Sequence, residues 1–161
     1  MTNDFRTTPV KRTTVFCRDI EKSLALYRDI LRLSIAEDKT ITGPAMVRMI
    51  GLADCKMRIV HLQSEHSDHG LIGLYAVLEP RLPEAPRPPT DRLHFGQVAV
   101  VLFTYEPDVI YNDLRTAGYT FLTPPTKYVK ATDGPMMKAG TYTEMLFFDP
   151  DGLLVSITGL P

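Results

Sequence analysis

Five prolines stand close together near the middle of this chain of 161 residues, within residues 79–91. Each proline fixes the backbone angle φ and lacks an N–H donor, so neither a helix nor an inner strand can pass through this segment. We interpret residues 79–93 as a stiff connector between two modules, residues 10–78 and 94–161, of a single domain. Any fold for this chain must therefore be built from two halves of similar length.

The first half has the pattern of one strand, one helix and three further strands. Residues 11–17 alternate in character and are rich in β-branched side chains, and Asp19 is a suitable N-cap for a helix that follows. Apolar residues then recur at helical spacing, so the helix should pack one face against a sheet. These residues are Ile20, Leu24, Tyr27 and Leu31. Three short β-type runs follow, at residues 45–50, 56–62 and 71–78.

The second half repeats this order. A valine-rich strand is expected at residues 95–103, Glu106-Pro107-Asp108 fits the start of a helix, and Gly118 fits its end. Further β-type runs follow at residues 119–122, 142–148 and 153–158. The last two are joined by Asp149-Pro150-Asp151-Gly152, which predicts a tight turn. The chain therefore reads as a duplicated βαβββ unit of the α+β class, and two such units should combine into one curved sheet structure with a central cavity.

Composition narrows the class of partner. Eighteen basic side chains face nineteen acidic ones, for a net charge of −1, which disfavours nucleic acid and anionic membranes as partners. No apolar stretch approaches the about 20 residues that span a bilayer, and the first residues lack the features of an export signal. We expect a cytoplasmic protein with a small-molecule ligand. Its two cysteines, Cys17 and Cys55, are expected to be reduced and buried.

Two segments at opposite ends of the duplicated chain carry a resemblance to a known family. Residues 15–31, which read VFCRDIEKSLALYRDIL, are similar to the opening motif of the glyoxalase I, bleomycin-resistance and extradiol-dioxygenase superfamily, also called vicinal oxygen chelate proteins. Residues 147–152, which read FFDPDG and precede an apolar strand, resemble the closing motif of the same superfamily. The resemblance implies paired βαβββ modules that form a half-barrel, often completed in a homodimer.

In metal-dependent members, the resemblance implies a divalent cation held by His or Glu side chains on the first and last strands of each module. The four matching positions here are Arg12, His61, Gln97 and Ser156. Only His61 is a plausible ligand, and a catalytic zinc or iron needs about three. Arginine keeps its proton in proteins, and at about 4 Å its repulsion of a divalent ion amounts to about 8 kcal/mol for an effective dielectric constant of about 20. We therefore expect neither a metal nor another cofactor, and an anion beside Arg12.

Two function hypotheses follow from the resemblance and these residues. In the first, the protein binds a small, anionic, partly apolar organic molecule without metal: Arg12 pairs with its charge, and four side chains orient its oxygens. These are Thr14, His61, Gln97 and Ser156. His61 is also the candidate catalytic residue for proton transfer. In the alternative, the protein is an isomerase, lyase or dioxygenase whose metal is held by a substituted set, such as His61 with His94 or Glu144.

Several of these residues have a second, structural interpretation. Arg12 could be a surface cation at the end of its strand, and His61 a histidine of the core. Strand tyrosines form either ligand walls or core, which applies to Tyr75, Tyr128 and Tyr142. Glu144 lies either at a solvated strand end or beside a specific partner. The acidic and histidine-rich residues 65–69 are interpreted as a hydrated loop.

Overall fold

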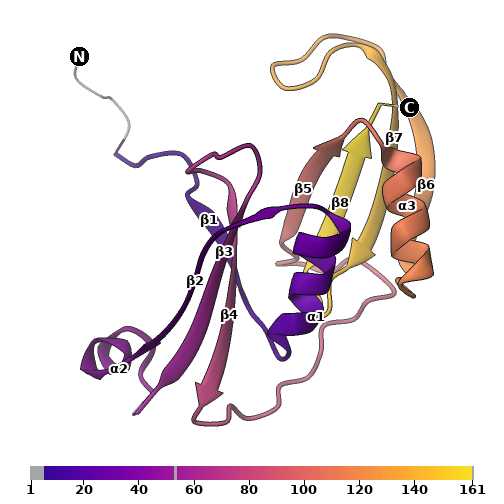
Figure 1. Ribbon diagram of the computed structural model, residues 1–161. Coiled ribbons are helices and arrows are strands. Elements are labelled where there is room, and N and C mark those ends of the chain that lie inside the picture. Colours follow the sequence, from indigo (N-terminus) through magenta and orange to yellow (C-terminus); the bar gives the residue numbers. More distant parts are fainter. Residues whose placement is uncertain (1–5, 53, 161) are drawn as a thin grey trace. The chain divides into compact units, whose positions relative to one another are not determined.

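The computed structural model describes residues 6–52 and 54–160 of the chain. The chain divides between residues 85 and 86 into two compact units, and each contains one four-stranded mixed sheet with helices (Figure 1). The predicted α+β class and the duplicated strand-helix-strand order are thereby confirmed. That the two units form a single domain around one cavity stays a prediction.

The sheet of the first unit has the strand order β1-β4-β3-β2. Its strands are β1 (Arg12–Phe16), β2 (Ser34–Thr42), β3 (Lys56–Gln63) and β4 (Leu71–Glu79). β1 is parallel to β4, whereas β3 is antiparallel to both of its neighbours. Side chains alternate between the two faces, and one face contributes the fully buried Val60, Leu62 and Leu74 to the core.

The helix predicted after Asp19 is present. Helix α1 (Ile20–Leu24) begins at Asp19, whose carboxylate accepts a hydrogen bond from the Glu21 backbone N–H at 3.1 Å. It continues as a π-helical segment, η1 (Ala25–Ile30). The predicted apolar positions Ile20, Leu24 and Tyr27 are buried, and α1 contacts β4. Burial of this stripe holds the helix on the sheet.

The strand predicted at residues 45–50 is wrong, because helix α2 (Pro44–Ile50) occupies this segment. Pro44 stands at the first helical position, and Gly51 ends the helix with a φ of 71°, the left-handed conformation typical of a helix C-terminus. The second strand of the unit is instead β2, which precedes this helix in the chain. β2 is an edge strand with mostly exposed side chains, so it has no apolar alternation by which to recognise it.

The second unit repeats the arrangement of the first, with strand order β5-β8-β7-β6 and β5 parallel to β8. Its elements are β5 (Ala99–Thr104), α3 (Pro107–Thr116), β6 (Phe121–Lys130), β7 (Gly140–Phe148) and β8 (Leu154–Gly159). Every residue of β8 is buried, and α3 lies alongside this sheet (Figure 1). The helix start at Pro107 agrees with the prediction, as does the chain reversal at Gly118, whose φ is 86°.

The predicted turn between β7 and β8 is confirmed. Asp149 is 5% exposed, and its Oδ1 accepts hydrogen bonds from the backbone N–H groups of Asp151 at 2.9 Å and Leu153 at 2.8 Å. Gly152 has a φ of 93° and its N–H donates to the Asp149 carbonyl at 3.1 Å. The aspartate side chain thus satisfies two backbone donors that the turn would otherwise leave unpaired.

The strands of the second unit differ from the prediction most at the start of β5 and at the end of β6. β5 begins at Ala99, not at residue 95, because residues 94–97 form a turn in which the Gln97 N–H donates to the His94 carbonyl at 3.1 Å. β6 extends to Lys130, well beyond the predicted 119–122. It tolerates Pro124 and Pro125 because it is an edge strand whose pairing with β7 is interrupted between Thr123 and Thr126.

Residues 80–98 contain no helix or strand, and that residues 79–93 act as a stiff connector stays a prediction. Cys17 and Cys55 are buried and not joined in a disulfide, as expected. Among the described helices, none is long and apolar enough to cross a membrane.

Candidate functional site

Four polar residues lie on one face of the first sheet, opposite the face packed on α1: Arg12, Thr14, His61 and Glu37. Strand pairing places Thr14 beside Gly73, Gly73 beside His61, and His61 beside Glu37, so one row crosses all four strands. Arg12 lies two residues before Thr14 on β1 and therefore shares this face. The sheet thus brings together three of the predicted site residues, Arg12, Thr14 and His61.

Arg12 is held against this face by its neighbours. Its Nε donates a hydrogen bond to Oγ1 of Thr14 at 3.2 Å, and its guanidinium carbon lies 5.7 Å from the centre of the Tyr75 ring. Gly73 lies beneath the arginine stem: a Cβ at this position would stand 3.3 Å from Cδ of Arg12 and 3.3 Å from Oγ1 of Thr14. The guanidinium is therefore directed over the sheet by a hydrogen bond and an aromatic face.

His61 is engaged through both of its ring nitrogens. Nε2 lies 3.1 Å from the hydroxyl of Tyr75, and Nδ1 lies 3.1 Å from Oε2 of Glu37. The other carboxylate oxygen of Glu37 pairs with Nζ of Lys39 at 2.7 Å. A carboxylate accepts only, so Glu37 selects the tautomer with the proton on Nδ1, and Nε2 then accepts a hydrogen bond from Tyr75.

The charges around His61 favour its neutral form. Burial lowers the pKa of His61 most strongly, the positive charge of Arg12 lowers it further, and the carboxylate of Glu37 opposes both effects. The ammonium of Lys39 holds the pKa of Glu37 below its ordinary value. The result is a neutral imidazole between an ionised carboxylate and a phenol, which is an arrangement suited to passing a proton.

The expected place of His61 on the last strand of its unit is wrong. His61 lies on β3, and β4 follows as the last strand. β4 carries Tyr75, which is paired with Phe16 of β1. The sequence indicated Tyr75 only as part of a ligand-binding wall or of the core. The contact of its hydroxyl with His61 was not predicted.

Glu37 was missed entirely by the sequence analysis, because the strand that carries it was not predicted. The other two candidate tyrosines lie in the second unit, where Tyr142 is buried and its ring stacks on that of Tyr128. Among the three tyrosines considered, Tyr75 alone contacts the predicted site residues of the first unit.

Gln97 and Ser156 belong to the second unit, and the structure does not bring these two together. Gln97 lies in the turn before β5, and its buried Oε1 has no hydrogen-bond partner among the described residues. Ser156 is 2% exposed, and its hydroxyl donates to Oε1 of Glu144 at 2.8 Å. Glu144 lies in the middle of β7, so the partnered interpretation of this acid is correct.

The residues present do not fit the divalent metal of the superfamily. Within the described parts of either unit, no three His, Cys, Asp or Glu side chains lie close enough together to hold an ion. On the first and last strands of the first unit stand Arg12, which has no lone pair to give, and Tyr75, whose hydroxyl already forms a hydrogen bond with His61. The loop at residues 65–69 is largely exposed, and its Asp68 pairs with Lys11 at 2.7 Å.

Two four-stranded sheets, each with its first and last strands parallel and adjacent, define a protein built from paired βαβββ modules. The sequence matches the family model described as the glyoxalase/bleomycin resistance protein/dioxygenase superfamily over residues 10–157, and the chain belongs to this superfamily. No protein of curated function matches it.

Solved structures of superfamily members share the fold at low sequence identity. A glyoxalase family protein from Bacillus cereus is similar with a TM-score of 0.69 and 15% identity, over 98% of this chain and 96% of that one. A glyoxalase/dioxygenase from Nostoc punctiforme has a TM-score of 0.60 and 17% identity, over 100% and 95% of the two chains. A superfamily member from Sphaerobacter thermophilus has a TM-score of 0.56 and 20% identity, over 97% and 100%.

Proposed function

We propose that this protein binds a small, partly apolar organic anion on the face of the first sheet that carries Arg12, and that it does so without a divalent metal. The observation that carries the proposal is the position of the Arg12 guanidinium, fixed by Thr14 and lying over the Tyr75 ring. A guanidinium with remaining N–H donors beside an aromatic face suits a carboxylate or phenolate attached to a flat apolar body.

His61 supplies the second function of the site. In its neutral form its Nε2 accepts a hydrogen bond from the Tyr75 hydroxyl, while its Nδ1–H donates to Glu37. A ligand O–H or activated C–H beside Tyr75 would give its proton to the phenol oxygen while the Tyr75 proton passes to Nε2 of His61, which leaves a ligand anion, a phenol and an imidazolium. This makes His61 the positioned base for metal-free proton transfer, and Tyr75 the group that would touch the ligand.

Gln97 and Ser156 of the second unit stay predicted ligand-binding residues. The unpaired Oε1 of Gln97 is a buried acceptor without a partner among the described residues, and a ligand hydroxyl or N–H would satisfy it. Ser156 and Glu144 already pair with each other and would offer their remaining acceptor sites. We also propose that the protein is a homodimer, as members of its superfamily are expected to be.

A metal-dependent isomerase, lyase or dioxygenase is the competing function. It requires His61 to release Tyr75 or Glu37 in order to coordinate an ion, with His94 or Glu144 as further ligands. It also requires an ion to bind near the positive charge of Arg12, which lowers the pKa of His61 and would oppose a cation for the same reason.

Thermal shift with a panel of aromatic carboxylates and phenolates tests the proposal. A hit should raise the melting temperature in a concentration-dependent way, and Arg12→Gln should weaken its binding by about tenfold or more, as expected for the loss of a charged hydrogen bond. Lys11→Gln is the control. It also removes one positive charge, from the residue next to Arg12 in the chain, but the Lys11 side chain pairs with Asp68. Equal affinity in Arg12→Gln, or stoichiometric binding of zinc, iron, nickel or manganese to untagged protein, would overturn the proposal.

A further inference from the structure

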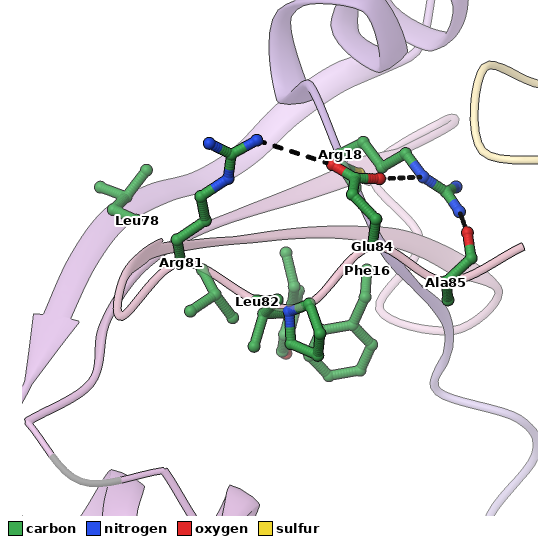
Figure 2. A pocket seen from close by; sticks show the side chains of 11 residues that line it. Phe16, Arg18, Leu78, Arg81, Leu82, Glu84 and Ala85 are labelled. Atoms are coloured by element: carbon green, nitrogen blue, oxygen red, sulfur yellow. Dashed lines mark hydrogen bonds and ion pairs between the residues drawn. The ribbon is translucent and has the colours of Figure 1, made fainter.

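A pocket of about 470 Å³ lies in the first unit, beside the ends of β1 and β4 and under residues 81–85 of the connector (Figure 2). Its apolar and aromatic lining comes from Phe16, Tyr75, Val77, Leu78, Leu82 and Pro83. Phe16, Leu78 and Leu82 are 53%, 46% and 40% exposed, so much of this apolar surface stays in contact with solvent. The volume is within the range of small-molecule sites.

The polar groups of the pocket consist of two arginines and a carboxylate between them. Glu84 lies 3.8 Å from Nε of Arg18 through one oxygen and 3.9 Å from an Nη of Arg81 through the other (Figure 2). Arg18 also donates a hydrogen bond to the Ala85 carbonyl at 3.0 Å. The pocket therefore carries one more positive charge than negative, at the edge of an apolar wall.

The ion pairs that Glu84 forms with Arg18 and Arg81 are weak, because their distances are long and two of the three side chains are exposed. Both distances exceed that of a hydrogen bond, and the side chains of Glu84 and Arg81 are 74% and 90% exposed. Pairs of this kind contribute little to stability because water and salt screen them. The Arg18 side chain is only 29% exposed, so its charge lies in the less screened position.

We propose that this pocket is a binding site for a small carboxylate with an apolar body, and that Glu84 occupies the place of the ligand carboxylate between Arg18 and Arg81. A ligand carboxylate that displaces Glu84 leaves the charge balance at the arginines unchanged and can approach Arg18 in the closer, two-pronged geometry. Its apolar body then covers the exposed wall formed by Phe16, Leu78 and Leu82. Tyr75 borders both sites, but this site goes beyond the proposed function because its charged groups are Arg18, Arg81 and Glu84 and it needs neither Arg12 nor His61.

Octanoate is the probe for this site, with 1-octanol as its uncharged counterpart. Backbone amide NMR should show shifts at residues 16–18, 75–78 and 81–85, and calorimetry should give the affinity. Glu84→Gln removes the competing carboxylate and should tighten octanoate binding about two- to fivefold, with no change for 1-octanol. Arg18→Gln should weaken octanoate binding about tenfold, and Arg81→Gln, at an exposed position, should weaken it less.

The two proposals are separated by their variants. Arg12→Gln should leave octanoate binding unchanged, and Glu84→Gln should leave unchanged the affinity of an aromatic anion whose binding depends on Arg12. Unchanged or weaker octanoate binding in Glu84→Gln, or amide shifts confined to other residues, would overturn the pocket proposal. If Arg18→Gln does not fold, Glu84→Gln and Arg81→Gln decide the question, because both change exposed side chains.

Discussion

The hydroxyl of Tyr75 lies 3.1 Å from Nε2 of His61 across the β3–β4 pair. Because Glu37 contacts Nδ1 of the same ring at 3.1 Å, an acid, an imidazole and a phenol follow one another across three strands. A fixed tautomer and a lowered imidazole pKa are the consequences that can be measured.

The pKa of His61 should lie below 6.5, the ordinary value for histidine, because burial and the charge of Arg12 both disfavour the imidazolium. NMR titration of the imidazole protons measures this directly. Arg12→Gln should raise the pKa of His61, whereas Lys11→Gln should not change it. A value at or above 6.5 in the unmodified protein would contradict the described environment.

The same shift should make stability depend on pH. The unfolded chain binds a proton at His61 more readily than the folded protein does, so the free energy of unfolding has its full value above pH 6.5 and falls as the pH drops below it. The fall ends once the folded His61 is protonated as well. Urea unfolding between about pH 5 and pH 8 should show this slope, and His61→Gln should reduce it.

Removing the Asp149 side chain should destabilise the β7–β8 turn. Asp149→Ala leaves two backbone N–H groups without their acceptor and should lower the free energy of unfolding by about 2–3 kcal/mol. Asp149→Asn keeps a side-chain oxygen and should cost less. Equal losses in the two variants, measured by urea unfolding, would show that the acceptor oxygen is not what holds the turn.

A methyl group at the end of β8 should not be tolerated. A Cβ on Gly159 would stand 2.6 Å from the Thr104 carbonyl oxygen and 2.8 Å from its Cγ2, so Gly159→Ala should cost about 2 kcal/mol or more. Gly140 is the matched control, because its nearest neighbour would lie 3.6 Å from a new Cβ. Melting temperatures of Gly159→Ala and Gly140→Ala that fall equally would contradict this packing.

An ion pair ties helix α1 and β2 to β3. Arg58 contacts both carboxylate oxygens of Asp38, at 3.0 and 2.8 Å, and Oε1 of Glu21 at 2.6 Å. Arg58 holds the pKa of Asp38 below its ordinary value of 3.8, so the contribution of this pair is present above that pH and is lost as the pH falls through the folded-state pKa. Asp38→Asn should cost roughly 0.5–1 kcal/mol near neutral pH, since the pair is partly exposed.

Asp29→Asn is the control for this prediction. Asp29 pairs with its sequence neighbour Arg28 and ties no two elements together, so its loss should change stability little. Chemical unfolding at neutral pH and near pH 3 separates the cases. A loss in Asp38→Asn that is as large at low pH as at neutral pH would contradict the role of the ionised carboxylate.

Helix starts and tight turns could be predicted from sequence because single side chains determine them. Asp19 and Asp149 each accept backbone hydrogen bonds within four residues, and such local chemistry is visible in the sequence. The segment at residues 44–50 was misassigned because a short apolar run fits a strand or a helix equally well. Its flanking Gly43-Pro44 and Gly51 are the helix signals that should have decided the question.

Three residues of the candidate site were predicted from the sequence, Arg12 and Thr14 on β1 and His61 on β3, but two of the groups that contact them were not. Alternation placed Arg12 and Thr14 on one face, and the structure agrees. Tyr75 and Glu37 could not be recognised, because their roles depend on which strands pair and in what register, and register is set by long-range packing. The resemblance supplied Arg12 and His61, whereas the place of the Tyr75 hydroxyl beside His61 depends on the pairing of β3 with β4.

Gly73 has no side chain at a point where those of Arg12, Thr14 and Tyr75 converge. Its small size determines how close to the sheet the Arg12 side chain can lie. An alanine there would stand 3.2 Å from a ring carbon of Tyr75 and 3.3 Å from the arginine stem, and would lift the guanidinium away from the sheet. At the proposed anion site, Gly73 would therefore set how closely a bound anion can approach the sheet. Changing the size of ligand that this proposed site accepts would begin at Gly73, which lies beneath the arginine and would make no polar contact of its own with the ligand.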